Sequence, residues 1–418
     1  MLANLTTPFL GIVATAVIGR LGEPALLGGV AIASIIFDCM FWLFGFLRMG
    51  TVAFTAQAVG ARDRTEVQAV LIRAVLIAAA VGIVLIILQA PLSTFMLGLM
   101  GGSDAVTNAA RLYFSVRLWS APFVLANYVV LGWLIGQART GIALALQIVI
   151  NVVNMVTTAG LVLGLGWGIA GAAFAAVIAE ATGLVVGAVV IWRILDGRID
   201  IPRRTLFDRT KLLHMLAINR DIMIRTAALI GAFLFFTAQG ARAGDDVLAA
   251  NAVLNNFILI GSFFLDGLAN AAEQLCGRSL GGRDRKNFEQ AVRLVVRWGF
   301  AFGATVTIIF ALGGASLIDV MTASPQVREV ARDFMWLAAL APVCGVMAYS
   351  FDGIYIGATW ARDMRNLMLA SLAIYFSSWA ALLHFGNAGL WIALLIFFLA
   401  RGLLQAWRYP ALVRSTFA

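Results

Sequence analysis

Six acidic residues lie in stretches of the chain that are otherwise apolar. They are Asp38, Glu180, Asp221, Asp266, Glu273 and Asp352. An ionisable group inside a membrane span is costly, so such residues usually mark a cavity, an ion path or an ionic partner. Asp352 stands in AYSFDGIYIG and Asp38 in IIFDCMFW, each without a basic residue within one helical turn. We expect these two acids to take up a proton readily, which suits a proton-coupled cycle or pairing with a cationic substrate.

Asp221 and Glu180 have different sequence surroundings. Asp221 is followed one turn later by Arg225 and is adjacent to Arg220, which predicts a local ion pair. Glu180 stands in VIAEATG and fits two interpretations, a coupling group or a protonated, hydrogen-bonded structural residue.

Helical spacing arranges further polar residues into two stripes. The first contains Asn251, Asn255, Ser262, Asp266, Asn270 and Glu273, and the second contains Gln147, Asn151, Asn154 and Thr158. Intervals of three, four and seven place the members of each stripe on one helix face. The pattern indicates a polar cavity shared by two parts of the molecule. Hydrogen bonding between packed helices is the alternative, because amides and hydroxyls often hold membrane helices together.

Enzymatic and metal-binding chemistry find little support. The two histidines, His214 and His384, lack metal-ligand spacing, and the three cysteines lie in apolar stretches that suit packing. No Walker A sequence and no Ser/His/Asp set stands out. We therefore expect neither an enzyme nor a metal site nor a cofactor, and any transport should be secondary.

These residues must be positioned by membrane helices. The chain has 418 residues, of which 62% are hydrophobic and 12% charged, whereas a soluble domain carries about 25% charge. At roughly 20 residues per crossing, the apolar runs predict an all-α polytopic membrane protein with twelve spans. We place them at 2–20, 28–50, 68–90, 114–137, 142–164, 168–193, 213–240, 247–275, 288–312, 333–357, 364–384 and 387–408.

The two sets of six spans form an internal repeat. A shift of 221 residues brings Gly60 onto Gly281, Gly136 onto Gly357 and the triplet at 62–64 onto that at 283–285. Because each half has an even number of spans, the repeat is parallel. We expect an N-terminal lobe at 1–193, a basic linker at 194–212 and a C-terminal lobe at 213–418. The segment 205–221 has no counterpart before Met1, so we expect the first helix to be truncated at its start.

The distribution of Lys and Arg between the loops predicts the orientation of the chain in the membrane. Seventeen Lys and Arg lie in one set of loops with the C-terminal tail, and five lie in the opposite loops. By the positive-inside rule both termini are cytoplasmic. The formal net charge of +9 thus reports topology, and we expect no nucleic-acid partner.

Several segments resemble the multidrug and toxic compound extrusion (MATE) family. They are NLTTPFLGIVATAVIGRLG at 4–22, FGFLRMGTVAFTAQAVGARD at 44–63, INRDIMIRT at 218–226, LDGLANAAEQLCGRSLGGRD at 265–284 and FDGIYIGATWARDMRN at 351–366. The resemblance is to the DNA-damage-inducible protein F (DinF) branch. It implies twelve helices in two lobes, and alternating access that exports small amphipathic, often cationic compounds across the bacterial inner membrane in exchange for H⁺ or Na⁺. A monomer in the lipid bilayer is the family expectation.

The resemblance also bears on the site. Ala14 stands where family members carry a coupling Asp on the first helix, and Thr158 where they tend to carry another. Asp352 and Asp266 match acidic positions on the tenth and eighth helices. We expect coupling around Asp266, Glu273 and Asp352, helped by Asp38, with Asn270, Asn255, Asn151, Asn154 and Glu180 in the cavity. The alternatives are an uncoupled or degenerate transporter and a lipid-linked precursor flippase, which would want a strongly basic cavity. The basic residues predicted near mid-span are Arg48, Arg117 and Arg225, which are fewer than the acids and do not favour the flippase.

Overall fold

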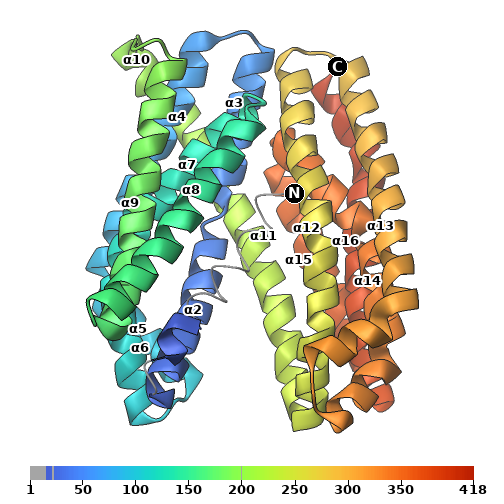
Figure 1. Cartoon of the computed structure of the whole chain (residues 1–418). Helices are drawn as coiled ribbons and strands as arrows, with labels where there is room; N and C mark the ends of the chain where they lie inside the picture. Colours follow the sequence, from blue (N-terminus) through green and yellow to red (C-terminus); the bar gives the residue numbers. More distant parts are fainter. Residues whose placement is uncertain (1–15, 21–22, 199) are drawn as a thin grey trace. The chain divides into compact units, whose positions relative to one another are not determined.

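The computed structural model describes residues 16–20, 23–198 and 200–418, and these are helical with short connections (Figure 1). In chain order the α-helices are α2 (Pro24–Leu43), α3 (Phe46–Gly60), α4 (Arg64–Ile87), α5 (Gln89–Met100), α6 (Asp104–Arg117), α7 (Ala121–Gly136), α8 (Thr140–Ala159), α9 (Gly168–Ile194), α10 (Arg203–Leu206), α11 (Arg209–Arg242), α12 (Asp245–Gly281), α13 (Arg285–Met321), α14 (Pro325–Gly357), α15 (Ala361–Ala381) and α16 (Gly386–Thr416). The all-α fold is confirmed.

Ten helical stretches in the described part of the chain are long and apolar enough to cross a membrane. They coincide with predicted spans, although several run further than predicted, as α13 does to Met321. The predicted first span, 2–20, lies outside the described residues except at its end, and with it the expected truncation. The eleventh predicted span, 364–384, is largely α15, which falls outside the ten.

Three of the spans are irregular in ways that the hydrophobic pattern does not reveal. The predicted span 28–50 is interrupted between α2 and α3, at Phe44 and Gly45. A single 3₁₀ turn, η1 (Leu118–Ser120), separates α6 from α7, and Pro122 follows it in the first turn of α7. Proline lacks an N–H and is best tolerated there. A π segment, η2 (Gly160–Gly164), ends the span that begins with α8.

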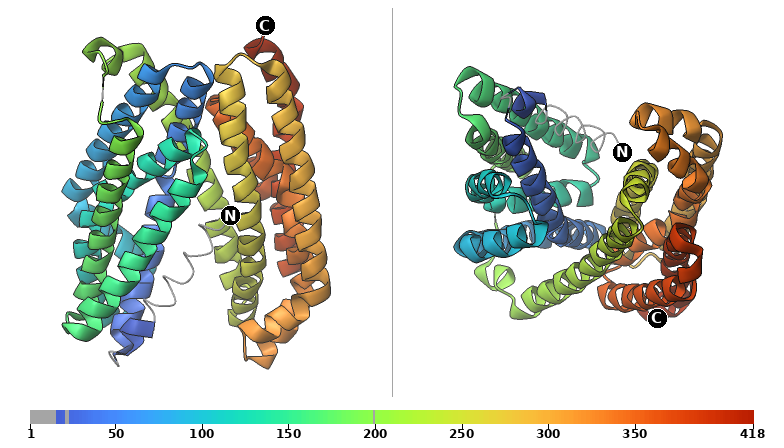
Figure 2. Two further views of the ribbon diagram at one scale, coloured as in Figure 1. Left: turned by 45° about the horizontal axis from the view of Figure 1, so that its top comes forward. Right: turned by 90° about the horizontal axis from the view of Figure 1, so that it is seen from below.

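The chain divides into two compact units. The first takes its described residues from Met1–Thr55 and Asp63–His214, and the second consists of Ala56–Arg62 and Met215–Ala418. In the first unit α4 packs against α7, α2 against α6 and α8 against α9. In the second unit α14 packs against α12, α13 and α16 (Figures 1 and 2). The end of α3 is grouped with the second unit, which the sequence did not predict.

Glycines set the closest helix crossings inside each unit, and they follow the repeat. A Cβ at Gly132 on α7 would lie 2.5 Å from the carbonyl oxygen of Arg48, and one at Gly353 on α14 would lie 2.3 Å from that of Ala269. Gly353 and Ala269 each lie 221 residues after their counterparts, Gly132 and Arg48. One turn later, Gly136 meets Val52 and Gly357 meets Glu273 with the same shift. The duplication therefore preserves the helix contacts as well as the sequence.

The repeated charged triplet has a structural role in both halves. Arg62 and Arg283 adopt φ values of 58° and 52°, which end the preceding helices in a left-handed turn. Asp63 then caps α4 by accepting from the N–H of Glu66 at 2.9 Å, and Asp284 caps α13 in the same way. These are standard helix stop and start devices.

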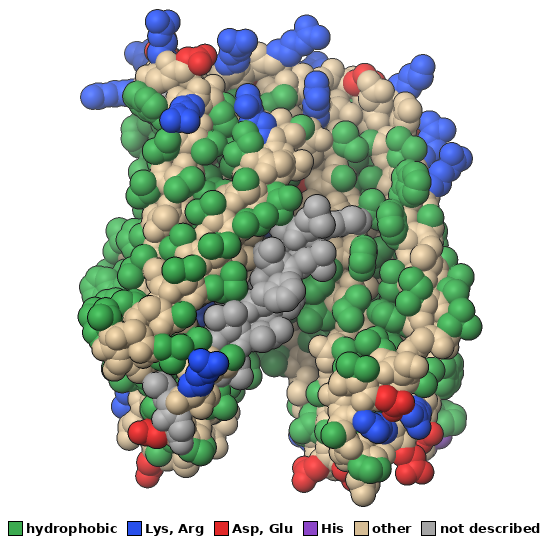
Figure 3. All heavy atoms as spheres, viewed as in Figure 1, with side chains coloured by type: hydrophobic (Ala, Val, Ile, Leu, Met, Phe, Trp, Pro, Cys, Tyr) green, Lys and Arg blue, Asp and Glu red, His purple; other side chains and the backbone are tan. Residues whose placement is uncertain are grey.

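The surface separates charge from apolar side chains. In Figure 3 the Lys and Arg side chains gather at the end of the first unit that carries α10, and at the end of the second unit that carries the C terminus. Apolar side chains cover the flanks of the helices, and exposed residues there include Leu312 and Trp407. Such an apolar belt is what a bilayer requires.

Candidate cation-coupling site

Asp352 lies at the meeting point of three helices of the second unit. The residue is 4% exposed. Oδ2 accepts hydrogen bonds from Nη2 of Arg225 on α11 and from Nη2 of Arg401 on α16, the latter at 2.5 Å. Oδ1 accepts from Nε2 of Gln405, also on α16, at 2.9 Å. The expectation that Asp352 lacks an ionic partner is wrong, because both partners come from other helices.

The local pair predicted for Asp221 is confirmed with the adjacent Arg220, at 3.0 Å, but not with Arg225, which pairs with Asp352. Asp221 also pairs with Arg365 at 2.7 Å. Arg365 lies in the second turn of α15, so this second pair joins two helices.

Arg401 was missed among the basic residues near mid-span. It is 1% exposed, and its guanidinium carbon lies 5.8 Å from the ring centroid of Tyr349 and 5.6 Å from that of Phe397. A signal was present in the sequence, because Arg401 and Gln405 are four residues apart and share one face of an otherwise apolar helix. That pattern predicts a buried polar partner on a neighbouring helix.

Two further acids join this group from α12. Asp266 and Glu273 are seven residues apart on one helix face, and Glu273 is 2% exposed. Arg225 interacts electrostatically with both, and Arg401 interacts with Asp266. The structure thus brings together the three acids that the sequence predicted and two arginines that it did not assign. We call Asp266, Glu273, Asp352, Arg225 and Arg401 the second-unit cluster.

The remaining members of the α12 stripe have mixed roles. Asn251 and Asn387 exchange hydrogen bonds of 2.8 and 3.0 Å, and Nε1 of Trp391 donates to Asn251 Oδ1 at 2.9 Å. Asn251 therefore joins α12 to α16, as the packing interpretation expects. Ser262 and the Tyr349 hydroxyl are 2.5 Å apart. The buried Oδ1 of Asn255 has no hydrogen-bond partner among the described residues, while Asn270 lies between the two acids.

The stripe on α8 is largely bonded along its own helix. Gln147 donates to Asn151 Oδ1 at 3.2 Å, and the Thr158 hydroxyl donates to Asn154 Oδ1 at 3.2 Å. Asn151 and Thr158 are buried. These contacts fit helix packing as well as a cavity wall, so the stripe alone does not distinguish the two.

The first unit has its own charged residues within its spans. Asn127 donates to the carboxylate of Glu180 at 2.7 Å and to its main-chain carbonyl at 2.9 Å. Arg117 donates to the hydroxyl of Tyr113 at 2.9 Å, and its guanidinium lies 4.8 Å from the Phe37 ring centroid. It interacts electrostatically with Asp38 and Glu180. Both acids predicted in this unit therefore face the same arginine.

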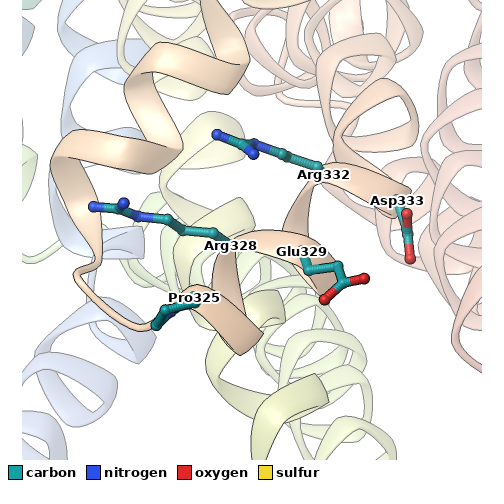
Figure 4. Close-up of a pocket in the computed structure, with 5 residues that line it drawn as sticks. All are labelled: Pro325, Arg328, Glu329, Arg332 and Asp333. Atoms are coloured by element: carbon teal, nitrogen blue, oxygen red, sulfur yellow. The ribbon is translucent and has the colours of Figure 1, made fainter.

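A small surface pocket lies at the start of α14, lined by Pro325, Arg328, Glu329, Arg332 and Asp333 (Figure 4). Arg328 and Arg332 extend to one side of the helix and the two acids to the other. Arg332 pairs with Asp319 of α13 at 2.6 Å, and both side chains are well exposed. This pocket belongs to the helix ends and is separate from the buried cluster.

The fold and site define a polytopic helical membrane protein whose two repeated halves each place acids and arginines together within their spans. The chain belongs to the MatE family, whose sequence model matches residues 1–159 and 222–377. The starts of these two matches are 221 residues apart, which is the shift found in the sequence.

Relatives cover nearly the whole chain. DNA damage-inducible protein F of Escherichia coli (strain K12) is 37% identical over 97% of this chain and 89% of its own length. A probable multidrug resistance protein NorM of Rhizobium meliloti (strain 1021) is 26% identical over 96% and 89%. A solved structure of MATE in the bent conformation has a TM-score of 0.91 at 19% identity, covering 100% of this chain and 95% of that one. At that identity the structural likeness establishes the fold alone.

Proposed function

We propose that this protein exports small amphipathic, cationic compounds across the bacterial inner membrane by alternating access, in antiport with H⁺ or Na⁺. The name of the NorM relative, a probable multidrug resistance protein, supports the substrate class. The charge asymmetry of the loops supports an orientation with both termini cytoplasmic. The protein acts as a monomer in this proposal.

One observation carries the coupling assignment: the second-unit cluster contains three acids and two arginines. Carboxylates gathered inside a membrane protein favour the uptake of H⁺, Na⁺ or a cationic substrate, because each raises the energetic cost of its neighbours' charges. Occupants that bind the same carboxylates exclude each other, and this mutual exclusion is the basic requirement of antiport.

In the first unit the acids and arginines are equal in number. The surroundings of Tyr128 include two acids, Asp38 and Glu180, and two arginines, Arg48 and Arg117. Their formal charges cancel, so no cation is needed there. Ala14, outside the described residues, and Thr158 remove the acids that the family resemblance places in this half. We therefore place coupling around Asp266, Glu273 and Asp352, and give Asp38 at most a supporting role.

Dye efflux from inverted vesicles tests the proposal. We expect transport that depends on an imposed pH or Na⁺ gradient and is lost in Asp266→Asn and Glu273→Gln. Asp319→Asn, which removes an exposed carboxylate from the same unit, serves as the matched control. Efflux that ignores both gradients would favour an uncoupled transporter. Movement of a lipid-linked pyrophosphate without dye efflux would favour the flippase, although each buried arginine of the cluster already faces a carboxylate.

A further inference from the structure

We propose that Arg293 and Arg297, on the outer side of α13, bind the phosphate group of an anionic phospholipid. The site belongs to the second unit, shares no residue with the second-unit cluster, and does not depend on which compound the protein transports. It gives a role to two arginines that neither the internal repeat nor the coupling site explains.

Both arginines lie on the side of α13 that faces away from the rest of the second unit. The helix packs against α12 and α14, and Val295, two residues before Arg297, is on its buried side. Arg293 and Arg297 are one turn apart and exposed. About three and four turns after Arg297, the same side presents Ile308 and Leu312, which are 57% and 84% exposed. Such apolar side chains face lipid, so the two arginines stand on a lipid-facing side of the helix.

Their position along α13 places the two arginines at the edge of the hydrocarbon core. The 21 residues from 298 to 318 contain no charged side chain. At 1.5 Å per residue they span about 31 Å, close to the roughly 30 Å of a typical core. Arg297 therefore lies where the core ends, and Arg293, about 6 Å further along the axis, lies among the lipid headgroups. In Figure 3, Lys and Arg side chains extend from one end of the second unit onto its flank.

Apolar side chains next to the arginines provide a surface for an acyl chain. Trp298 is 57% exposed and Leu294, one turn before it, is 44% exposed. The ring centroid of Trp298 lies 6.0 Å from that of Phe302. Tryptophan is enriched where membrane helices meet the interface, which agrees with the depth assigned to Arg297. A lipid can thus place its phosphate on the arginines and a chain along this strip.

Both guanidinium groups are available to a ligand. Among the described residues, neither Arg293 nor Arg297 has an ion pair. Glu289, the acid that precedes them on α13, pairs with Arg285 at 2.8 Å. Nε of Arg293 donates to the carbonyl oxygen of Glu289 at 3.3 Å. The planar fork of arginine matches the oxygens of a phosphate and can bind them in a bidentate manner.

The first unit provides an internal comparison. The shift of 221 residues superposes the N-caps of α4 and α13. It places Arg293 on Ile72 and Arg297 on Leu76, and Leu76 is 49% exposed. The same outward position is therefore apolar in one unit and basic in the other. Since the fold does not require arginine there, the pair serves an interaction that is specific to the second unit.

Native mass spectrometry of the purified full-length protein resolves individual bound lipids and tests the site. Titration with dioleoyl phosphatidylglycerol, and separately with dioleoyl phosphatidylcholine, gives the dissociation constant of the first bound lipid. An arginine near an anionic lipid contributes about fivefold in affinity, so the pair should favour phosphatidylglycerol by about 25-fold. Equal affinities for the two lipids would overturn the proposal.

Variants locate the effect on α13. Arg293→Ile with Arg297→Leu copies the first unit and should weaken phosphatidylglycerol binding by about 25-fold, while phosphatidylcholine binding stays unchanged. Arg293→Gln with Arg297→Gln should act in the same way and removes the charges without adding apolar surface. The matched control, Arg203→Gln with Arg204→Gln, removes two exposed charges from the linker and should leave the dissociation constant unchanged. An equal loss in the control would assign the effect to overall charge and refute the site.

Glycerol 3-phosphate carries the phosphate without acyl chains, so it distinguishes a lipid from a free phosphate as the ligand. We expect it to leave bound phosphatidylglycerol in place at equal concentration, because Leu294 and Trp298 contact the chains of the lipid only. Displacement of the lipid would show a site for free phosphate and would overturn the lipid assignment.

Discussion

The substitution Gly353→Ala tests whether the glycine crossings hold each unit together. Gly353 lies on α14 against α12, and an added Cβ would be 2.3 Å from the carbonyl oxygen of Ala269 and 2.8 Å from its Cα. Folded proteins essentially never show such contacts below 3.0 Å. The atoms in the way are main-chain atoms, so no side-chain rotation relieves the clash.

The cost follows from the geometry. The two helices must separate by about 0.7 Å, the difference between 3.0 and 2.3 Å. Overpacking of this kind costs about 1–3 kcal/mol. The movement also shifts Asp352, the preceding residue, relative to Arg225 and Arg401. We therefore expect a net fall in the free energy of unfolding, because the overpacking cost exceeds the roughly 0.5–1 kcal/mol that replacing Gly by Ala in a helix gains.

Gly313→Ala is the matched control. Gly313 lies on α13 at an exposed position with nothing within 4 Å of an added Cβ. In a helix interior the change from Gly to Ala is favourable by about 0.5–1 kcal/mol. Unfolding in mixed micelles with increasing dodecyl sulfate, followed by circular dichroism, compares the two variants. If Gly353→Ala proved as stable as Gly313→Ala, the crossing would be looser than the structure indicates, and the reasoning would fail.

Three further changes test other contacts. Arg73→Gln removes a buried side chain that donates to main-chain carbonyls of α10 and pairs with Glu66 at 2.6 Å. Trypsin should therefore cut the linker at 194–212 faster than in the wild type. An unchanged rate would show that the contacts of Arg73 do not hold this linker in place. Asn251→Ala leaves buried donors on α16 without an acceptor and should cost about 1–3 kcal/mol of unfolding free energy, whereas Asn256→Ala, whose amide bonds only to its own helix, should cost less. Gly281→Ala places a Cβ 1.9 Å from a carbonyl oxygen at the end of α3 and should destabilise at least as much as Gly353→Ala in the same micelle titration; a smaller loss would contradict the steric argument.

The order of the spans within the described residues was predictable because a bilayer imposes strict rules. Every main-chain polar group must be paired within the span, so an apolar run of sufficient length becomes a helix. The break at Phe44 and Gly45 was not predicted, because its flanking residues are as apolar as the rest of the span. The full lengths of α13 and α14 were not predicted either. Both helices continue beyond the apolar run into charged residues that water solvates.

The site was predictable only in part. Helical periodicity placed Asp266 and Glu273 on one face, since both lie on one helix. The partners of Asp352 could not be found in this way, because Arg225 and Arg401 are 127 and 49 residues away in the chain. Local spacing therefore predicted no ionic partner for Asp352, and it predicted that Arg225 would pair with Asp221. A buried charge in a membrane helix needs a partner somewhere, but the sequence does not say on which helix.

The repeat explains the backbone of this protein and leaves its chemistry unexplained. The 221-residue shift maps the crossings of α7 in the first unit onto those of α14 in the second, Gly132 onto Gly353 and Gly136 onto Gly357. The same shift places Leu131 opposite Asp352 and Leu259 opposite Asp38. A helix crossing tolerates almost no change at its closest contact, because any added atom meets a main chain. A buried charge is constrained only by its partner, so the two halves were free to arrange their charges differently. The ion-coupling chemistry therefore cannot be transferred from one half to the other by symmetry, and it has to be read from the charge balance of each unit.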